Sequence, residues 1–152
     1  MLLNVAFLIE YLRSAHWDWS VAVLTDLFRA LGLAEVGPHA GQATRYFRAS
    51  SGLACVTFAD PLDLTPTGFE FPFTVPSVAG VSAAEMLEQF VRLVRMPVGM
   101  VLGPPSVSSS WDVGSSTIVV EARPGQEGPS DVVALVVRRR PVAGAATFLQ
   151  RP

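Results

Sequence analysis

The sequence has few of the residues that usually carry covalent and metal chemistry. Among its 152 residues are one cysteine, Cys55, and two histidines, His16 and His39. A single cysteine excludes an internal disulfide bond and fits a reducing compartment. Two histidines weigh against a histidine-based metal site. Lysine is absent, and because arginine supplies the positive charge, we interpret this as a GC-rich coding bias rather than a sign of function.

Charged residues are also scarce, at 16% of the chain, whereas 50% of the residues are hydrophobic and the mean hydropathy is +0.40. The formal net charge is −2 and the isoelectric point is about 5.6, so no basic excess indicates a nucleic-acid partner. Such an apolar balance predicts either a thick core or a surface that binds a partner.

Residues 2–12 form an apolar stretch that could be mistaken for a targeting or membrane segment. The stretch lacks a basic start and a small-residue cleavage site, and Asn4 and Glu10 interrupt it. It is also too short to span a bilayer. We therefore expect a cytoplasmic protein whose residues 2–12 belong to the core, as a helix or, alternatively, as a strand over residues 3–9.

A second helix is predicted over residues 21–31, where apolar side chains recur at helical spacing. Asp18 or Ser20 can cap its first turn, because both side chains carry an acceptor oxygen. Gly32 follows the last apolar residue and is a plausible C-terminal cap.

Three strands are predicted next. Residues 44–49 and 53–59 are two apolar runs joined by the short polar turn 50–52, which predicts a hairpin. Residues 69–75 alternate apolar and other side chains. Because Pro72 cannot donate to a neighbouring strand, we expect residues 69–75 to form an edge strand.

The clearest local signal is a capping box formed by Ser82 and Glu85. In such a box the serine hydroxyl accepts from the N–H of the glutamate, which reaches back to the serine N–H. Apolar residues then recur at helical spacing, which predicts a helix over residues 82–96. Pro97 should end this helix, because the residue before a proline avoids the α region.

Apolar runs follow at residues 98–102, 117–122 and 132–137 and predict two or three further strands. The last two runs are joined by the polar segment 123–131, so they should form an antiparallel hairpin. In residues 132–137 both faces are apolar, which predicts a central strand covered on both sides.

The order of these elements predicts a single α+β domain over residues 1–152. Its mostly antiparallel sheet should have about five to six strands, packed against two to three helices. If the first segment is a strand instead, the order approaches a ferredoxin-like βαββαβ core with additions.

Short motifs near both ends of the chain recur together. They are Trp17, Trp19, Gly32, the Leu-Gly-Pro-Pro run 102–105, Trp111 and the apolar runs 117–122 and 132–137. In these motifs the chain resembles small uncharacterised actinobacterial proteins that are similar to immunity proteins of polymorphic toxin systems. The resemblance skips the proline-rich middle, residues 61–76. It implies a protein that neutralises a cognate toxin without a catalytic motif of its own.

Two clusters are candidates for partner binding. The candidate residues are Trp17, Asp18, Trp19, Trp111, Arg138, Arg139 and Arg140. Tryptophan is enriched in binding hot spots, and an arginine run can bind an acidic surface. The structural alternatives are a helix–helix corner for the tryptophans, with Asp18 as a cap, and a strand end kept soluble by its arginines.

Catalytic candidates are weak. Cys55 lies inside an apolar run, so pairing with His39 or His16 as a nucleophile and base is disfavoured. The carboxylates that could bind a cation or form an acid–base pair are Asp60, Asp63 and Glu70, but no calcium-loop pattern surrounds them. We therefore expect no catalytic residue, no metal and no cofactor.

These observations favour a non-enzymatic protein-binding module of the immunity type, with no nucleic-acid or membrane partner. One alternative is a small secretion or assembly chaperone, which would use the sheet face and form a homodimer. Another is a small-ligand-binding protein or enzyme, with its site between the sheet and helix 82–96.

Overall fold

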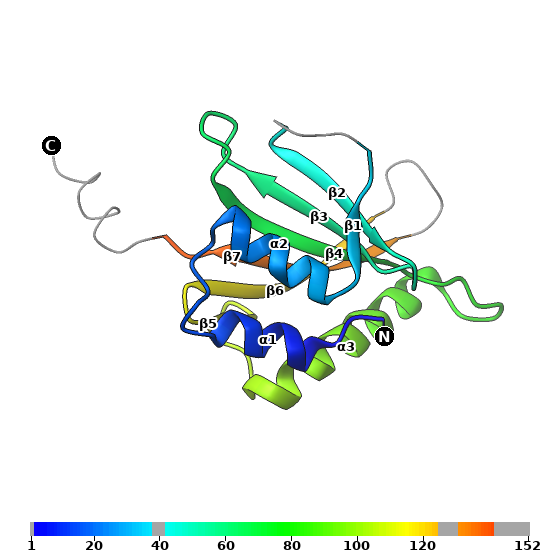
Figure 1. Cartoon of the computed structure of the whole chain (residues 1–152). Helices are drawn as coiled ribbons and strands as arrows, with labels where there is room; N and C mark the ends of the chain where they lie inside the picture. The colour runs from blue at the N-terminus through cyan, green and yellow to red at the C-terminus, as the bar shows by residue number, and fades with distance from the viewer. Residues whose placement is uncertain (1, 38–41, 125–130, 142–152) are drawn as a thin grey trace, which may run out of the picture.

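The structure is a computed structural model that describes residues 2–37, 42–124 and 131–141, and it has the predicted α+β architecture (Figure 1). The helices are α1 (Val5–Arg13), α2 (Val21–Ala30) and α3 (Ala83–Leu102). The strands are β1 (Leu33–Glu35), β2 (Thr44–Ala49), β3 (Ala54–Ala59), β4 (Pro66–Thr74), β5 (Ser110–Val113), β6 (Ser116–Arg123) and β7 (Val132–Arg139).

All seven strands belong to one sheet in the order β1-β2-β3-β4-β7-β6-β5, and every neighbouring pair is antiparallel. The sheet therefore consists of two meanders, β1–β4 and β5–β7, and α3 connects them along the chain. β7 lies between β4 and β6, which confirms that it is a central strand. The sheet has one or two strands more than the sequence predicts.

The additional strands β1 and β5 are short, at three and four residues. Leu33 in β1 pairs with Ala49, and Trp111 in β5 pairs with Ile118. Neither segment is long enough to show an alternating pattern, so tertiary pairing decides their conformation.

The prediction that residues 69–75 form an edge strand is wrong, because β4 lies between β3 and β7. The rule behind the prediction, that a proline cannot donate a hydrogen bond to a neighbouring strand, still applies at Pro72 itself. Pro72 pairs with Ala134 on the β7 side, whereas the ladder with β3 ends at Glu70. At Pro72 the strand is thus locally an edge, where a missing N–H leaves no neighbour unsatisfied.

α3 begins as predicted and ends later than predicted. The Ser82 Oγ accepts from the N–H of Glu85 at 3.1 Å. Pro97 lies inside the helix, and the run 98–102 forms its last turns instead of a strand. Val94 and Val98 are both buried on one helix face, and breaking the helix at Pro97 would expose them. Burying two valines outweighs one lost hydrogen bond.

The N-terminal segment is helical, so the strand alternative for residues 3–9 is wrong. Asn4 caps α1, because its Oδ1 accepts from the N–H of Phe7 at 3.0 Å. Ser20, rather than Asp18, caps α2 by accepting from the N–H of Val23 at 3.2 Å. No helix in the described ranges combines the length and the apolar character needed to cross a membrane.

The three helices pack on one face of the sheet, and Figure 1 shows α2 in front of the strands and α1 below it, beside α3. Phe69 lies near the centre of this core, within 6.2 Å of the rings of Trp17, Trp19 and Phe28. Residues of the opposite face, such as Glu70, alternate with these core positions along each strand.

Candidate functional site

The three tryptophans, which the sequence makes candidates for partner binding, lie in the core. None of them is more than 8% exposed. The rings of Trp17 and Trp19 are 5.3 Å apart, and the Trp19 Nε1 donates to the Ser116 Oγ at 3.1 Å. Trp111 donates to the carbonyl oxygen of Gly103 at 2.9 Å. Their rings pack within the fold and expose little area in this structure.

Asp18 is exposed beside these rings and accepts from the N–H of Ser20 at 3.0 Å. Hydrogen bonds from Ser20 hold the pKa of Asp18 below its ordinary value. Asp18 is therefore a charged turn residue at the entry to α2.

The arginine run at the end of β7 is divided among separate contacts. Arg138 donates to Glu121, and Arg140 donates to the carbonyl oxygen of Gly114 at 2.9 Å. Arg139 is exposed. Arg138 and Arg140 thus hydrogen-bond the end of β7 to β6 and to the turn between β5 and β6.

The catalytic candidates do not form a site. Cys55 is buried, and burial, reinforced by the negative charge of Glu70, raises the pKa of its thiol well above the ordinary value. A protonated thiol is a poor nucleophile. His16 is exposed, and His39 lies outside the described residues.

The acidic candidates have structural partners. Asp60 and Asp63 accept from the backbone N–H groups of Leu62 and Thr65 at 2.8 and 2.9 Å and shape a turn. The buried Glu70 accepts from Arg123. Within the described ranges, no group of three or more histidine, cysteine, aspartate or glutamate side chains is placed to hold a metal ion.

The outer face of α3 carries an apolar stripe that the sequence reading missed. Leu93, Met96 and Met100 are 52%, 57% and 81% exposed. Their spacing of three and four residues places them on one helix face, opposite the buried Val94 and Val98. The outward face of a surface helix is normally polar. Three exposed apolar side chains in a row on this face are therefore unusual and indicate a contact surface.

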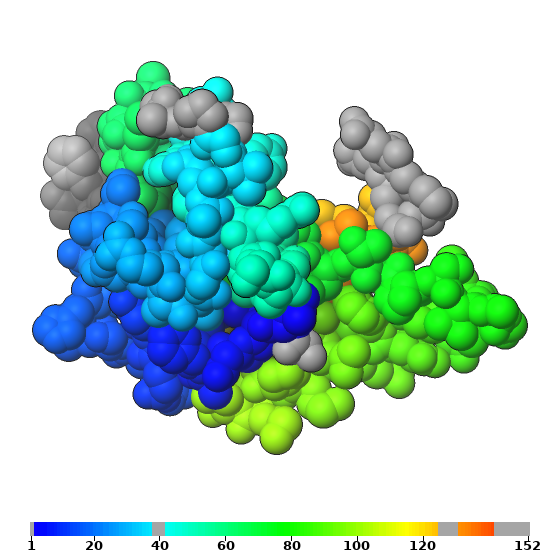
Figure 2. Space-filling view, turned by 45° about the vertical axis from the view of Figure 1, so that its right-hand side comes forward, coloured from blue at the N-terminus to red at the C-terminus, as the bar shows by residue number. Residues whose placement is uncertain are grey.

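The stripe continues into a groove of about 560 Å³ between α3 and the end of the sheet. The groove opens where β3 and β4 separate beyond Glu70, and its apolar walls include Leu2, Phe73, Phe90 and Leu93. We call the stripe and the groove together the α3 surface. Figure 2 shows α3, in green to yellow-green, along the lower edge of the molecule beside α1 in dark blue.

Arginines border the α3 surface, and one of them is paired with a carboxylate of the same helix. Between Gln89 and Trp111 the chain has two arginines, Arg92 and Arg95, and no carboxylate. Arg92 donates to Glu88 at 2.7 Å, whereas Arg95 lies over the Trp111 ring at 5.4 Å. Arg48 lines the groove. An apolar stripe with a basic border is complementary to an apolar segment flanked by acidic residues.

A sequence signal for this surface exists. The helical spacing of Phe90 and Val94 continues without a break through Val98 past Pro97. Extending the helix on this basis places Met96 and Met100 on the outward face, where methionines are unexpected.

Comparison with protein-family models, curated proteins and solved structures finds no match for this chain. We therefore infer function from the surfaces and cavities of the fold.

Proposed function

We propose that this chain is a non-enzymatic protein-binding module and that the α3 surface is its contact face. The observation that carries the proposal is the exposure of Met96 and Met100 on the outer face of α3. Methionine side chains adapt to irregular apolar surfaces and are frequent at protein-binding faces. The partner presents an apolar segment that fills the groove and acidic residues that meet Arg48 and Arg95.

The immunity type is the form of this function that the sequence resemblance supports. An immunity protein acts by covering a toxin, so it needs a complementary surface and no catalytic group. The buried Cys55, with its raised thiol pKa, agrees with such a role. The cognate toxin, encoded beside this chain, is then the acidic partner.

A second copy of this chain is a poorer fit to the α3 surface. In a symmetric dimer the same patch faces itself, which brings Arg95 close to its own copy. Like charges across a contact are unfavourable. Sedimentation at micromolar concentration should therefore show a monomer, whereas a stable homodimer would favour the chaperone alternative.

The test is protection of growing cells from the product of the neighbouring gene. Wild-type chain should restore growth, and M96E/M100E should fail to do so. V36E/L62E is a matched control, because it adds the same two charges at exposed apolar positions away from α3. A neighbouring product that is harmless, or equal protection by M96E/M100E, would contradict the proposal.

A further inference from the structure

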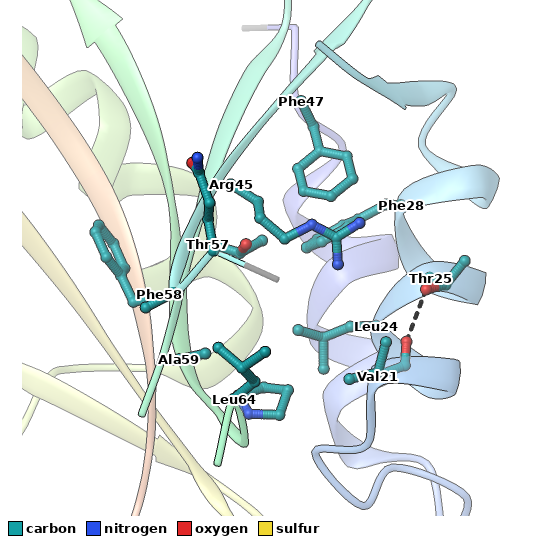
Figure 3. Close-up of a pocket in the computed structure, with 13 residues that line it drawn as sticks. Val21, Leu24, Thr25, Phe28, Arg45, Phe47, Thr57, Phe58, Ala59 and Leu64 are labelled. Atoms are coloured by element: carbon teal, nitrogen blue, oxygen red, sulfur yellow. Dashed lines mark hydrogen bonds between the residues drawn. The ribbon is translucent and has the colours of Figure 1, made fainter. Parts of the chain in front are cut away.

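A second feature, separate from the α3 surface, is a cavity of about 150 Å³ between α2 and strands β2 and β3 (Figure 3). Its walls are largely apolar and include Val21, Leu24, Phe28, Phe47, Leu64 and Pro66. Phe28 and Phe47 lie against each other with ring centroids 4.9 Å apart. A cavity of this size holds one six-membered ring.

Two polar groups converge on this cavity. Arg45 and Thr57 are direct cross-strand neighbours, so their side chains share one face of the sheet. Figure 3 shows the Arg45 guanidinium projecting toward α2 between Phe47 and Leu24, with Thr57 beside it on the sheet. Among the described residues, the Thr57 hydroxyl has no hydrogen-bond partner.

Glu35 holds the guanidinium in place and leaves one of its nitrogens available. Arg45 Nε donates to Glu35 Oε2 at 2.7 Å, and its Nη2 donates to Glu35 Oε1. The Phe47 ring lies 5.5 Å from the guanidinium carbon and restricts it further. Both N–H groups of Nη1 therefore remain for another acceptor.

We propose that this cavity binds a small monocarboxylate with a ring-sized apolar body. The ring occupies the space between Phe28, Leu24 and Leu64. The carboxylate accepts from Arg45 Nη1 and from the Thr57 hydroxyl, and bonds of this charge-assisted kind are strong in partly dry sites. Because Glu35 already offsets part of the charge of Arg45, a ligand with two negative charges should bind more weakly than a monocarboxylate.

Titration with benzoate, followed by amide ¹H–¹⁵N spectra, tests the proposal. Benzoate should bind with a dissociation constant on the order of 1 mM, as expected for about nine heavy atoms. Saturable shifts should appear at Thr25, Phe28 and Thr57, whereas Met96 and Met100 on the α3 surface should not move. Benzamide should bind at least about tenfold more weakly, because it lacks the charge.

Variants separate the carboxylate contact from general damage to the fold. R45Q should weaken benzoate binding about tenfold or more, and R29Q, at an exposed arginine of α2 outside the cavity, should leave it unchanged. A59L fills the cavity from β3 and should abolish binding while the spectrum stays dispersed. Absence of saturable shifts at the cavity, or wild-type affinity in a folded R45Q, would overturn the proposal.

Discussion

The two faces of the sheet are stabilised by different interactions, apolar burial on one face and ion pairing on the other. On the helix-covered face Phe69, Leu135 and Val137 are fully buried, and apolar area removed from water supplies the stability. On the opposite face Glu70 is buried beside an arginine. The same central strands, β4 and β7, carry both arrangements, because successive side chains point to opposite faces.

The opposite face is organised by a chain of ion pairs. Arg123 Nη1 donates to Glu70 Oε1 at 2.8 Å, and its Nη2 donates to Glu121 Oε2 at 2.8 Å. Arg138 donates to the other oxygen of Glu121. The hydrogen bonds to Glu70 and Glu121 raise the pKa of Arg123. Area burial on one face and charge pairing on the other should respond differently to substitution and to pH.

The largest difference between the faces should come from truncating neighbouring residues of β7. Val137→Ala should lower the free energy of unfolding by about 2 to 3 kcal/mol, because it leaves a cavity in the helix-covered core. Val136→Ala removes the same two carbons on the other face, where flexible ion-paired side chains can close over the gap, and should cost about 1 kcal/mol. Urea denaturation measures both, and equal costs at the two valines would refute the division into two faces.

Removing the central arginine should have the next largest effect. Arg123→Ala should cost about 2 kcal/mol, because it leaves the buried Glu70 carboxylate without its counter-ion, and the partial exposure of Arg123 limits the loss. Arg138→Ala is the control and should cost less than about 1 kcal/mol, since Glu121 keeps Arg123. Adding Glu70→Gln to Arg123→Ala should recover part of the loss. Equal costs for the two arginines would count against a pairing centred on Glu70.

The smallest expected effect is the contribution of the ion-paired face to the pH dependence of stability. Hydrogen bonds from Arg123 and Arg138 lower the pKa of Glu121 below its ordinary value of 4.5. Because the folded pKa is the lower one, this stabilisation is present above about pH 4.5 and is lost as the pH falls through the folded value. We expect a contribution below about 1 kcal/mol, since Glu121 is partly exposed. Urea midpoints at pH 7 and pH 3.5 should differ less for Glu121→Gln than for wild type, and identical differences would contradict the pairing.

The parts of the fold that the sequence predicts are those specified by local physics. The hairpin of β2 and β3 follows from two apolar runs and a polar turn, and the start of α3 follows from Ser82 and Glu85. The position of β4 beside β7 is not local, because it depends on the β5–β7 meander returning to the same sheet. A proline does mark a locally unpaired strand side, as at Pro72, but it does not place the whole strand at the edge of the sheet.

The candidate site was predicted less well than the fold, for a related reason. Tryptophan is common both in cores and in interfaces, so Trp17 and Trp19 could not be assigned from composition alone. The predicted end of the helix at Pro97 placed Met100 in a strand. An apolar residue is ordinary in a strand, so Met100 did not indicate a surface patch. Only when α3 continues through Pro97 do Met96 and Met100 become exposed neighbours.

The most direct test of the proposed function is the affinity for the product of the neighbouring gene, measured by isothermal titration calorimetry. We predict that M96E/M100E binds at least about 100-fold more weakly than wild type, since buried apolar anchors dominate such contacts. V36E/L62E should bind within about threefold of wild type. Wild-type affinity in a folded M96E/M100E would contradict the assignment of the α3 surface as the binding face.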